Sequence, residues 1–214
     1  MNTNKPARPV KKEMLAPEDY LDAKALAKLR QYVKDRAAKH KSYKAQMDRV
    51  LVELMVGSGL RSGVEVCQLN MRDLPIYHRH CAVHVRCGKG RKVRTVQIHP
   101  RLAGLLDRFV RQWRNVNRYT VYDCPDAPVF VGGRNGNRLV YRDLYTKIVR
   151  IGRDALGRHL TPHVLRHTFA TRLYSIDNDL LNTSAQLGHA SVATTQIYAR
   201  TLSKAARAQA NELW

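Results

Sequence analysis

Two short stretches near the end of the chain decide how it folds: residues 161–167 read TPHVLRH, and residues 187–198 read LGHASVATTQIY. Threonine followed by proline is a strong helix start, because Thr161 can cap the helix and Pro162 suits its first position. Gly188 is a typical helix end, so a further helix follows it. The sequence therefore predicts helices over residues 162–174, 178–187 and 191–200.

The same stretches carry groups that can break a phosphodiester without a metal ion. His163 and Arg166 are three residues apart, so they share one face of the helix. The N–H groups at the start of that helix also favour an anion. Tyr198 could attack a phosphate bound there, and His189 lies on the intervening turn. Taken alone, this spacing is weak evidence and favours a helix with a capped histidine and a solvated arginine.

The charge of the chain is strongly one-sided. It has 38 Lys and Arg against 17 Asp and Glu, a formal net charge of +21 and a pI of about 10.3. Such an excess indicates a nucleic-acid partner, with a ribosomal-type protein or an anionic membrane surface as alternatives. No apolar run reaches the ~20 residues that span a bilayer, so no membrane partner is expected. The length of 214 residues allows one core or two small domains.

The four cysteines follow no disulfide framework, which favours reduced thiols and a cytoplasmic, nucleoid-associated protein. Residues 77–87, YHRHCAVHVRC, invite a zinc interpretation. Their spacing fits no standard zinc finger, and the same residues alternate as a half-exposed strand does. We therefore expect no metal and no cofactor.

Hydrophobic periodicity and turn residues predict a mainly α fold with a small antiparallel β-sheet, an α+β class. A basic arm over residues 1–13 precedes a helix that opens at Pro17 with Leu21 already on its apolar face. Further expected helices start near Ser42, Arg61 (with Val64 inward), Pro100 and residue 141. Expected strands cover residues 82–86, 92–98 and 128–131.

The chain resembles the tyrosine recombinase (phage integrase) family in four stretches of sequence. Residues 160–198 resemble its C-terminal signature, and residues 59–61, GLR, its first arginine box. Residues 88–94, GKGRKVR, resemble its lysine hairpin, and residues 15–19, LAPED, the start of its catalytic domain. The resemblance covers about residues 15–205 and implies the fold of that catalytic domain.

The resemblance implies a site-specific DNA recombinase that cuts and rejoins double-stranded DNA through a 3′-phosphotyrosyl intermediate, with six catalytic residues. Tyr198 would be the nucleophile. Arg61 and Arg166 would bind the phosphate oxygens. Lys89 would protonate the leaving 5′-oxygen, His163 would assist proton transfer at the tyrosine, and His189 would hydrogen-bond the phosphate.

Neighbouring residues leave alternatives open. Lys92 is the second candidate for the role of Lys89, and Arg91, Lys92 and Arg94 are candidate contacts to the DNA backbone. His167 is interpreted as structural, because one position round the helix from Arg166 it faces elsewhere. Glu65 lies four residues after Arg61, one more than the family pattern. In a regular helix that extra residue would turn the acid by ~100° and leave the arginine unsupported.

The expected organisation is a basic arm over residues 1–13, a catalytic domain over 14–201 and a C-terminal helix over 202–214. That helix is expected to dock on a neighbouring subunit or on its own, within a homo-oligomer of two to four copies on DNA. The resemblance also implies a minimal form without the usual N-terminal core-binding domain. The alternatives are a catalytically silent DNA-binding protein on the same fold, and DNA relaxation of the type IB topoisomerase kind.

Overall fold

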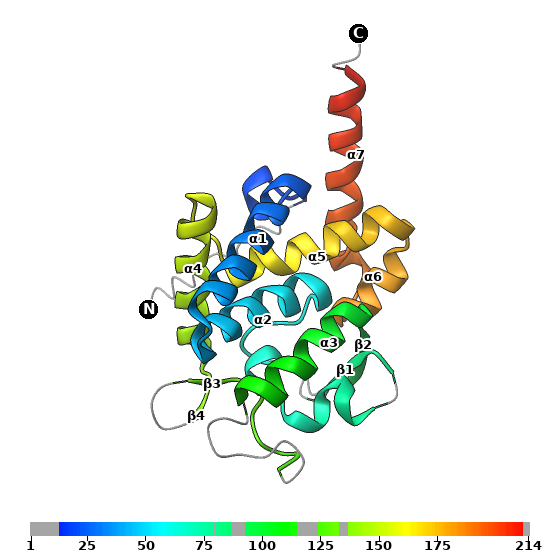
Figure 1. Ribbon diagram of the computed structural model, residues 1–214. Coiled ribbons are helices and arrows are strands. Elements are labelled where there is room, and N and C mark those ends of the chain that lie inside the picture. The colour runs from blue at the N-terminus through cyan, green and yellow to red at the C-terminus, as the bar shows by residue number, and fades with distance from the viewer. Residues whose placement is uncertain (1–12, 79, 87–92, 115–123, 133–136, 212–214) are drawn as a thin grey trace, which may run out of the picture.

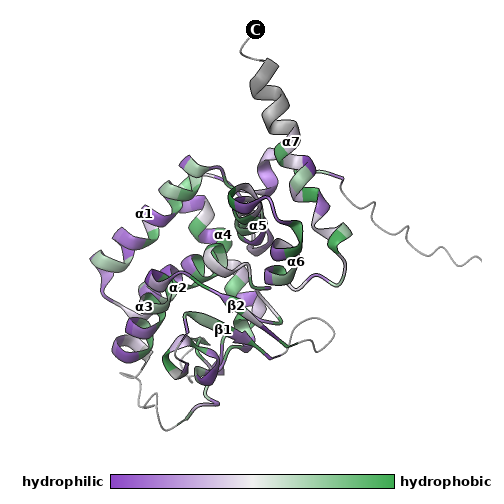
Figure 2. Cartoon of the chain, turned by 90° about the vertical axis from the view of Figure 1, so that its right-hand side faces the viewer, coloured by the Kyte–Doolittle hydropathy of each residue, from purple (hydrophilic) through white to green (hydrophobic). Residues whose placement is uncertain are grey.

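A computed structural model describes residues 13–78, 80–86, 93–114, 124–132 and 137–211. Helices α1 (Ala23–His40) and α2 (Tyr43–Ser58) form a hairpin, and α4 (Tyr141–Leu156) packs against α1 (Figure 1). Helix α2 also contacts α3 (Pro100–Phe109) and α5 (Pro162–Asp177), so it lies at the centre of the fold. The helices have polar and apolar faces around this centre (Figure 2).

Capping residues set the first two helices. Asp22 caps α1 through its side chain, and Ser42 caps α2. The helix expected from Pro17 is therefore interrupted: Pro17–Asp19 is a short 3-10 turn, and α1 begins only after Asp22. Leu21 is nevertheless buried, and its backbone N donates to the Thr168 hydroxyl at 2.9 Å.

The helix predicted from Arg61 is wrong. Helix α2 ends at Gly59, whose φ of +62° suits glycine. The chain then makes wide turns, in which Val66 N donates to the Arg61 carbonyl at 2.9 Å and Cys67 N to the Ser62 carbonyl at 3.0 Å. A 3-10 turn follows over Val66–Gln68, and Val64, expected inward, is 49 % exposed.

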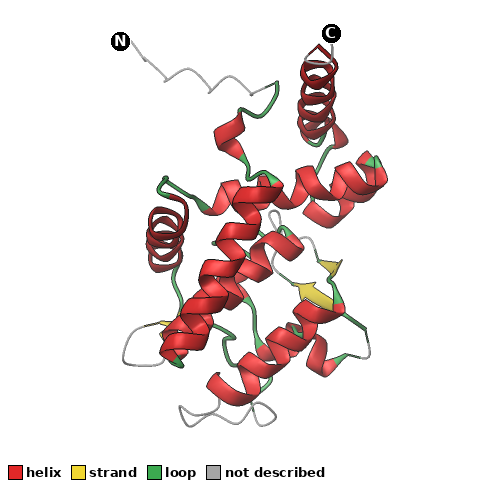
Figure 3. Cartoon of the chain, turned by 45° about the horizontal axis from the view of Figure 1, so that its top comes forward, coloured by secondary structure: helices red, strands yellow, loops and turns green. Residues whose placement is uncertain are grey.

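Two short antiparallel hairpins match the small β content expected, but of the strand predicted over residues 128–131 only Val131 lies in a strand. Strand β1 (Ala82–Val85) pairs with β2 (Arg94–Gln97), with Val83 opposite Val96. Strand β3 (Val131–Gly132) pairs with β4 (Asn137–Arg138). The β1–β2 hairpin lies beside α6 (Leu180–Leu187), which contacts β2 (Figure 3).

The C-terminal helices follow the sequence prediction closely. Helix α4 spans the predicted residues, α5 runs a turn longer than expected, and a 3-10 turn over Val192–Thr194 precedes α7 (Gln196–Asn211). The tail predicted as a separate helix is a continuation of α7, which projects from the body (Figure 1). No helix among the described residues is long and apolar enough to cross a membrane.

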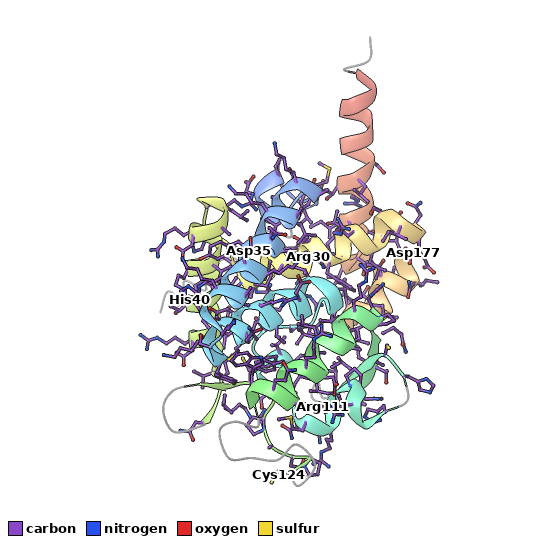
Figure 4. The ribbon with its side chains drawn as sticks, in the orientation of Figure 1. Arg30, Asp35, His40, Arg111, Cys124 and Asp177 are labelled. Carbon is purple, nitrogen blue, oxygen red and sulfur yellow. The ribbon has the colours of Figure 1, made fainter. Side chains whose placement is uncertain are left out.

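One buried carboxylate joins three helices on the side of α1 and α4. Asp48 of α2 is 1 % exposed and accepts from Arg36 of α1 at 2.6 Å. From α4 it accepts from Lys147 at 3.3 Å and Arg150 at 2.5 Å. Figure 4 labels His40 on this side and Asp177, at the end of α5, on the other.

Candidate active site

Arg166 lies in the first half of α5, which Thr161 caps as predicted. Arg166 is 7 % exposed. It donates through Nη1 to the carbonyl of Gly59 and through Nη2 to that of Leu187, the latter at 2.8 Å. Burial, followed by the charge of Arg61, lowers the pKa of Arg166 to about 10, so it stays protonated at neutral pH.

Arg61 follows the end of α2 and borders the same pocket as Arg166. Its Nη1 donates to Glu65 Oε1 at 2.8 Å, its backbone N to Glu65 Oε2 at 2.8 Å and its Nη2 to the Gly188 carbonyl at 2.9 Å. Glu65 therefore supports Arg61 although it lies four residues away, because the wide turns after Arg61 bring the acid back beneath it.

Arg94 of β2, a predicted contact to the DNA backbone, has partners inside the protein. Its Nη1 and Nη2 donate to the two carboxylate oxygens of Glu65 at 2.7 and 2.9 Å, and its Nε to the Gln186 carbonyl at 3.1 Å. The side chain is 13 % exposed. Arg94 therefore helps to pair the Glu65 carboxylate, because a buried carboxylate needs cations around it.

Glu65 is the carboxylate that joins these two arginines. Burial alone would raise its pKa, but hydrogen bonds from Arg94 and from the backbone and side chain of Arg61 outweigh burial and lower the pKa. Glu65 is therefore ionised at neutral pH, and it holds both guanidinium planes.

The C-terminal end of α6 collects all three arginines. The successive carbonyls of Gln186, Leu187 and Gly188 accept from Arg94, Arg166 and Arg61 respectively. These carbonyls have no partner inside the helix, and the helix dipole favours cations at this end. Gly188 has a φ of +64°, and a Cβ there would lie 2.8 Å from Arg94 Nη1. The predicted glycine end of α6 therefore also makes room for an arginine.

Tyr198, the predicted nucleophile, lies in the first turn of α7 and is 2 % exposed. It packs in a small apolar cluster with Leu15, Ala170 and Leu187. Burial raises the pKa of Tyr198 to about 12, although the charge of Arg166 acts in the opposite direction. In this arrangement the phenol is protonated and shielded from solvent.

His167 contacts the tyrosine oxygen, which the sequence analysis did not foresee. Its Nδ1 lies 3.1 Å from the Tyr198 hydroxyl, within hydrogen-bond distance. The sequence analysis interpreted His167 as structural and gave it no partner at the tyrosine. The signal that could have found it is its position four residues after His163, which places both residues on one face of α5.

The other two predicted histidines lie on either side of the arginines. His163 is exposed and lines a pocket of about 270 Å³ together with Arg61 and Arg166. His189 Nδ1 lies 2.9 Å from the Thr195 hydroxyl. Burial and the charges of Arg166 and Arg61 lower the pKa of His189 to about 4, so this imidazole is neutral at pH 7.

Lys89, Arg91 and Lys92 lie outside the described residues. A larger cavity of about 820 Å³ lies between α1, α2 and α3, and the lining residues include Arg30, Glu53 and His99 but none of the five described catalytic candidates. The described residues contain no group of three or more His, Cys, Asp or Glu side chains that could hold a metal ion.

Known sequences similar to this chain belong to one family. The sequence model of the phage integrase family matches residues 19–204. Tyrosine recombinase XerC of Vibrio vulnificus strain YJ016 is 36 % identical over 152 residues, which are 71 % of this chain and 45 % of the relative. XerC of Pseudomonas aeruginosa PAO1 is 37 % identical over 154 residues, 72 % of this chain and 47 % of the relative. The chain spans about half the length of the curated relatives it matches.

Solved structures show the same fold. The XerA recombinase superposes with a TM-score of 0.72 at 28 % identity, covering 93 % of this chain and 65 % of that one. The XerH site-specific recombinase bound to palindromic difH substrate in a post-cleavage complex gives a TM-score of 0.70 at 27 % identity. That match covers 84 % of this chain and 48 % of XerH.

Proposed function

Because the chain belongs to the phage integrase family, we propose that it is a site-specific recombinase that cleaves and rejoins double-stranded DNA through Tyr198. The single observation that carries the proposal is the junction of Arg61, Arg166 and His163 at one pocket, with Tyr198 on the adjoining helix. The names of the XerC relatives and the DNA complex of XerH support it. So does the formal charge of +21.

In the proposed reaction, Tyr198 Oη attacks the phosphorus and loses its proton. The bond from phosphorus to the 5′-oxygen breaks, which leaves a 3′-phosphotyrosyl link and a 5′-hydroxyl. Attack by a 5′-hydroxyl of another strand reverses these steps and frees the tyrosine. The covalent bond conserves the energy of the phosphodiester, so the chemistry proposed here uses side chains alone.

Arg61 and Arg166 are proposed to bind the two non-bridging oxygens. Their hydrogen bonds to Gly188, Gly59 and Leu187 carbonyls fix both guanidinium planes before any phosphate arrives. Such preorganised donors stabilise the charge that develops in the transition state. A planar guanidinium also matches two phosphate oxygens, which an ammonium cannot.

His189 is proposed to donate a third hydrogen bond to the phosphate. When the Thr195 hydroxyl donates to Nδ1, the ring proton of neutral His189 is on Nε2 and is available to an oxygen. His163 is proposed to assist proton transfer at the tyrosine from the pocket that it shares with Arg61 and Arg166. Lys89 is proposed as the general acid for the 5′-oxygen, with Lys92 as its alternative.

The experiment that tests the function is trapping on a DNA duplex nicked beside the cleavage site, so that the released fragment diffuses away. The wild-type chain should form a covalent protein–DNA band. Tyr198→Phe should form none while retaining DNA binding in a gel-shift assay. Tyr32→Phe, on α1, is the matched control and should trap DNA as the wild type does.

One observation favours the second candidate, a DNA-binding protein that does not cleave. Tyr198 is 2 % exposed, so little of this residue is open to a phosphate in this arrangement. If the wild type binds DNA but traps none over a range of nicked sites, this candidate replaces the recombinase.

We further propose that residues 14–201 form the catalytic domain, preceded by a basic arm over residues 1–13. Residues 202–214, which include the second half of α7, would dock on a neighbouring copy, giving two to four copies on DNA. The projection of α7 from the body supports this (Figure 3). Deleting residues 204–214 should then reduce complexes of several copies to single copies on DNA, measured by sedimentation. Unchanged assembly would contradict it.

A further inference from the structure

The contact between His167 and Tyr198 joins α5 to α7 at the atom that is proposed to react. His167 Nδ1 lies 3.1 Å from the tyrosine hydroxyl, and the ring centroids are 5.9 Å apart at 55° to one another. The two rings are tilted and not stacked, and the short Nδ1–Oη distance is that of a hydrogen bond. The imidazole therefore contacts the phenolic oxygen itself.

The phenol at this position needs a base. Burial raises the pKa of Tyr198 to about 12, so only about one molecule in 10⁵ would carry the phenolate at pH 7. Arg166 lowers that pKa but does not overcome the burial. A neutral phenol is a weak nucleophile, and an adjacent base is the usual remedy.

Among the three histidines of the site, His167 is the one with this contact. His163 is exposed and lines the pocket shared by the two arginines. His189 Nδ1 lies at the Thr195 hydroxyl, and burial together with the charges of Arg166 and Arg61 lowers the pKa of His189 to about 4, which makes it a poor proton acceptor. Tyr198 of α7 lies within hydrogen-bond distance of His167, and the charge of His167 acts on His189, which lies on the turn after α6.

We propose that His167 is a catalytic residue, the general base that takes the phenolic proton of Tyr198 onto Nδ1 as Oη attacks the phosphorus. The proposal rests on the proposed function. Nδ1 must start without a proton, so the neutral ring carries its proton on Nε2. The O–H bond breaks as the O–P bond forms, and the departing 5′-oxygen takes a proton from the general acid. In the rejoining step the His167 imidazolium returns its proton to Oη.

The test is the single-turnover rate of covalent trapping on the nicked duplex, for wild type, His167→Ala and His167→Asn. Loss of a general base typically costs 10²–10⁴-fold, so we expect His167→Ala to trap about 10²-fold or more slowly with unchanged DNA binding. His159→Ala, at an exposed histidine before α5, is the matched control and should trap at the wild-type rate.

His167→Asn separates a base from a structural contact. Its amide can still hydrogen-bond the tyrosine from nearly the same position, but it cannot take a proton. A base therefore predicts that Asn is as slow as Ala, and that added imidazole speeds His167→Ala more as the pH rises through the pKa of free imidazole. Recovery of the wild-type rate by Asn would overturn the proposal, because the contact alone would then suffice.

A second substrate isolates the nucleophile. With sulfur in place of the bridging 5′-oxygen, the leaving group needs no general acid. His167→Ala should remain slow on this substrate, while Lys89→Ala should recover. If His167→Ala instead matches or exceeds the wild-type rate, His167 is not the base, although trapping by the wild type would leave the recombinase function intact. Absence of any wild-type adduct would remove both.

Discussion

Two buried carboxylates, one in α2 and one just after it, gather cations in different ways. Asp48, in the first half of α2, is 1 % exposed and accepts from Arg36, Lys147 and Arg150. Glu65, beyond the end of α2, is 2 % exposed and accepts from Arg61 and Arg94. Both satisfy the rule that a buried charge must be paired.

The difference lies in where the guanidinium groups go next. The cations around Asp48 tie α1 and α4 to α2 and lie toward the surface, with the Arg150 side chain 41 % exposed. The arginines on Glu65 continue to the carbonyls of Gly188 and Gln186, beside the arginine of α5. Similar local chemistry therefore joins helices in one place and, in the proposed mechanism, orients arginines for a phosphate in the other.

The largest effect on this comparison is expected from a matched pair of arginine-to-lysine variants. Arg166→Lys keeps a charge but loses the planar fork that holds two carbonyls and binds oxygens, so the trapping rate should fall by about 10²–10³-fold. Arg150→Lys, at the Asp48 cluster, should leave the rate per folded molecule unchanged. Equal rates for the two variants would show that the Arg166 geometry is not used for chemistry.

A second pair neutralises the carboxylates themselves. Removing one member of a buried ion pair typically costs about 3–5 kcal/mol, so Glu65→Gln should unfold at a clearly lower urea concentration than the wild type. The urea midpoint of Asp48→Asn should fall by a smaller amount, because the cations around Asp48 are more exposed. Only Glu65→Gln should also slow trapping, by about 10²-fold, since the Arg61 guanidinium would no longer be held in position. An equal loss of rate in Asp48→Asn would erase the distinction between the clusters.

The pH dependence of stability sharpens the comparison further. The folded pKa of Glu65 is lowered, so its contribution is present above the ordinary value of 4.5 and is lost as the pH falls through the lower folded pKa. Wild type should therefore lose free energy of unfolding below about pH 4.5, and Glu65→Gln should lose less over that range. Parallel curves from urea unfolding at several pH values would contradict this.

The smallest expected effect concerns His189. Its pKa is lowered from 6.5 to about 4, so between these values the unfolded chain binds a proton that the folded chain does not. Stability should thus fall as the pH drops from 6.5 toward 4, and His189→Asn should flatten that slope. The same urea series measures it, with His159→Ala as the control that keeps the wild-type slope.

Local signals predicted most of the fold. The caps Ser42 and Thr161, the glycine ends and the 3.6-residue periodicity located the helices, because these features act within a few residues. The helix expected at Arg61 does not form: one helix-like bond joins Glu65 N to the Arg61 carbonyl, but the bonds from Val66 N and Cys67 N span five residues and a 3-10 turn follows.

The parts of the site that sequence missed are contacts between distant segments. Arg94 was a predicted contact to the DNA backbone. The sequence could not show that the Glu65 carboxylate lies within hydrogen-bond distance of it, because the two residues are 29 positions apart. His167 was interpreted from its position next to Arg166 on the same helix. Its partner Tyr198 lies 31 positions away on another helix, and local sequence patterns do not predict how the two helices pack. The predictions for Lys89, Arg91 and Lys92 stay predictions.

The central claim is that Tyr198 forms the bond to DNA beside the arginines organised by Glu65 and the end of α6. The most direct measurement is mass spectrometry of the peptides from the trapped wild-type complex after digestion of protein and DNA. The account predicts a single modified peptide that carries a 3′-linked nucleotide on Tyr198. A nucleotide on any other residue, with Tyr198 unmodified, would contradict it.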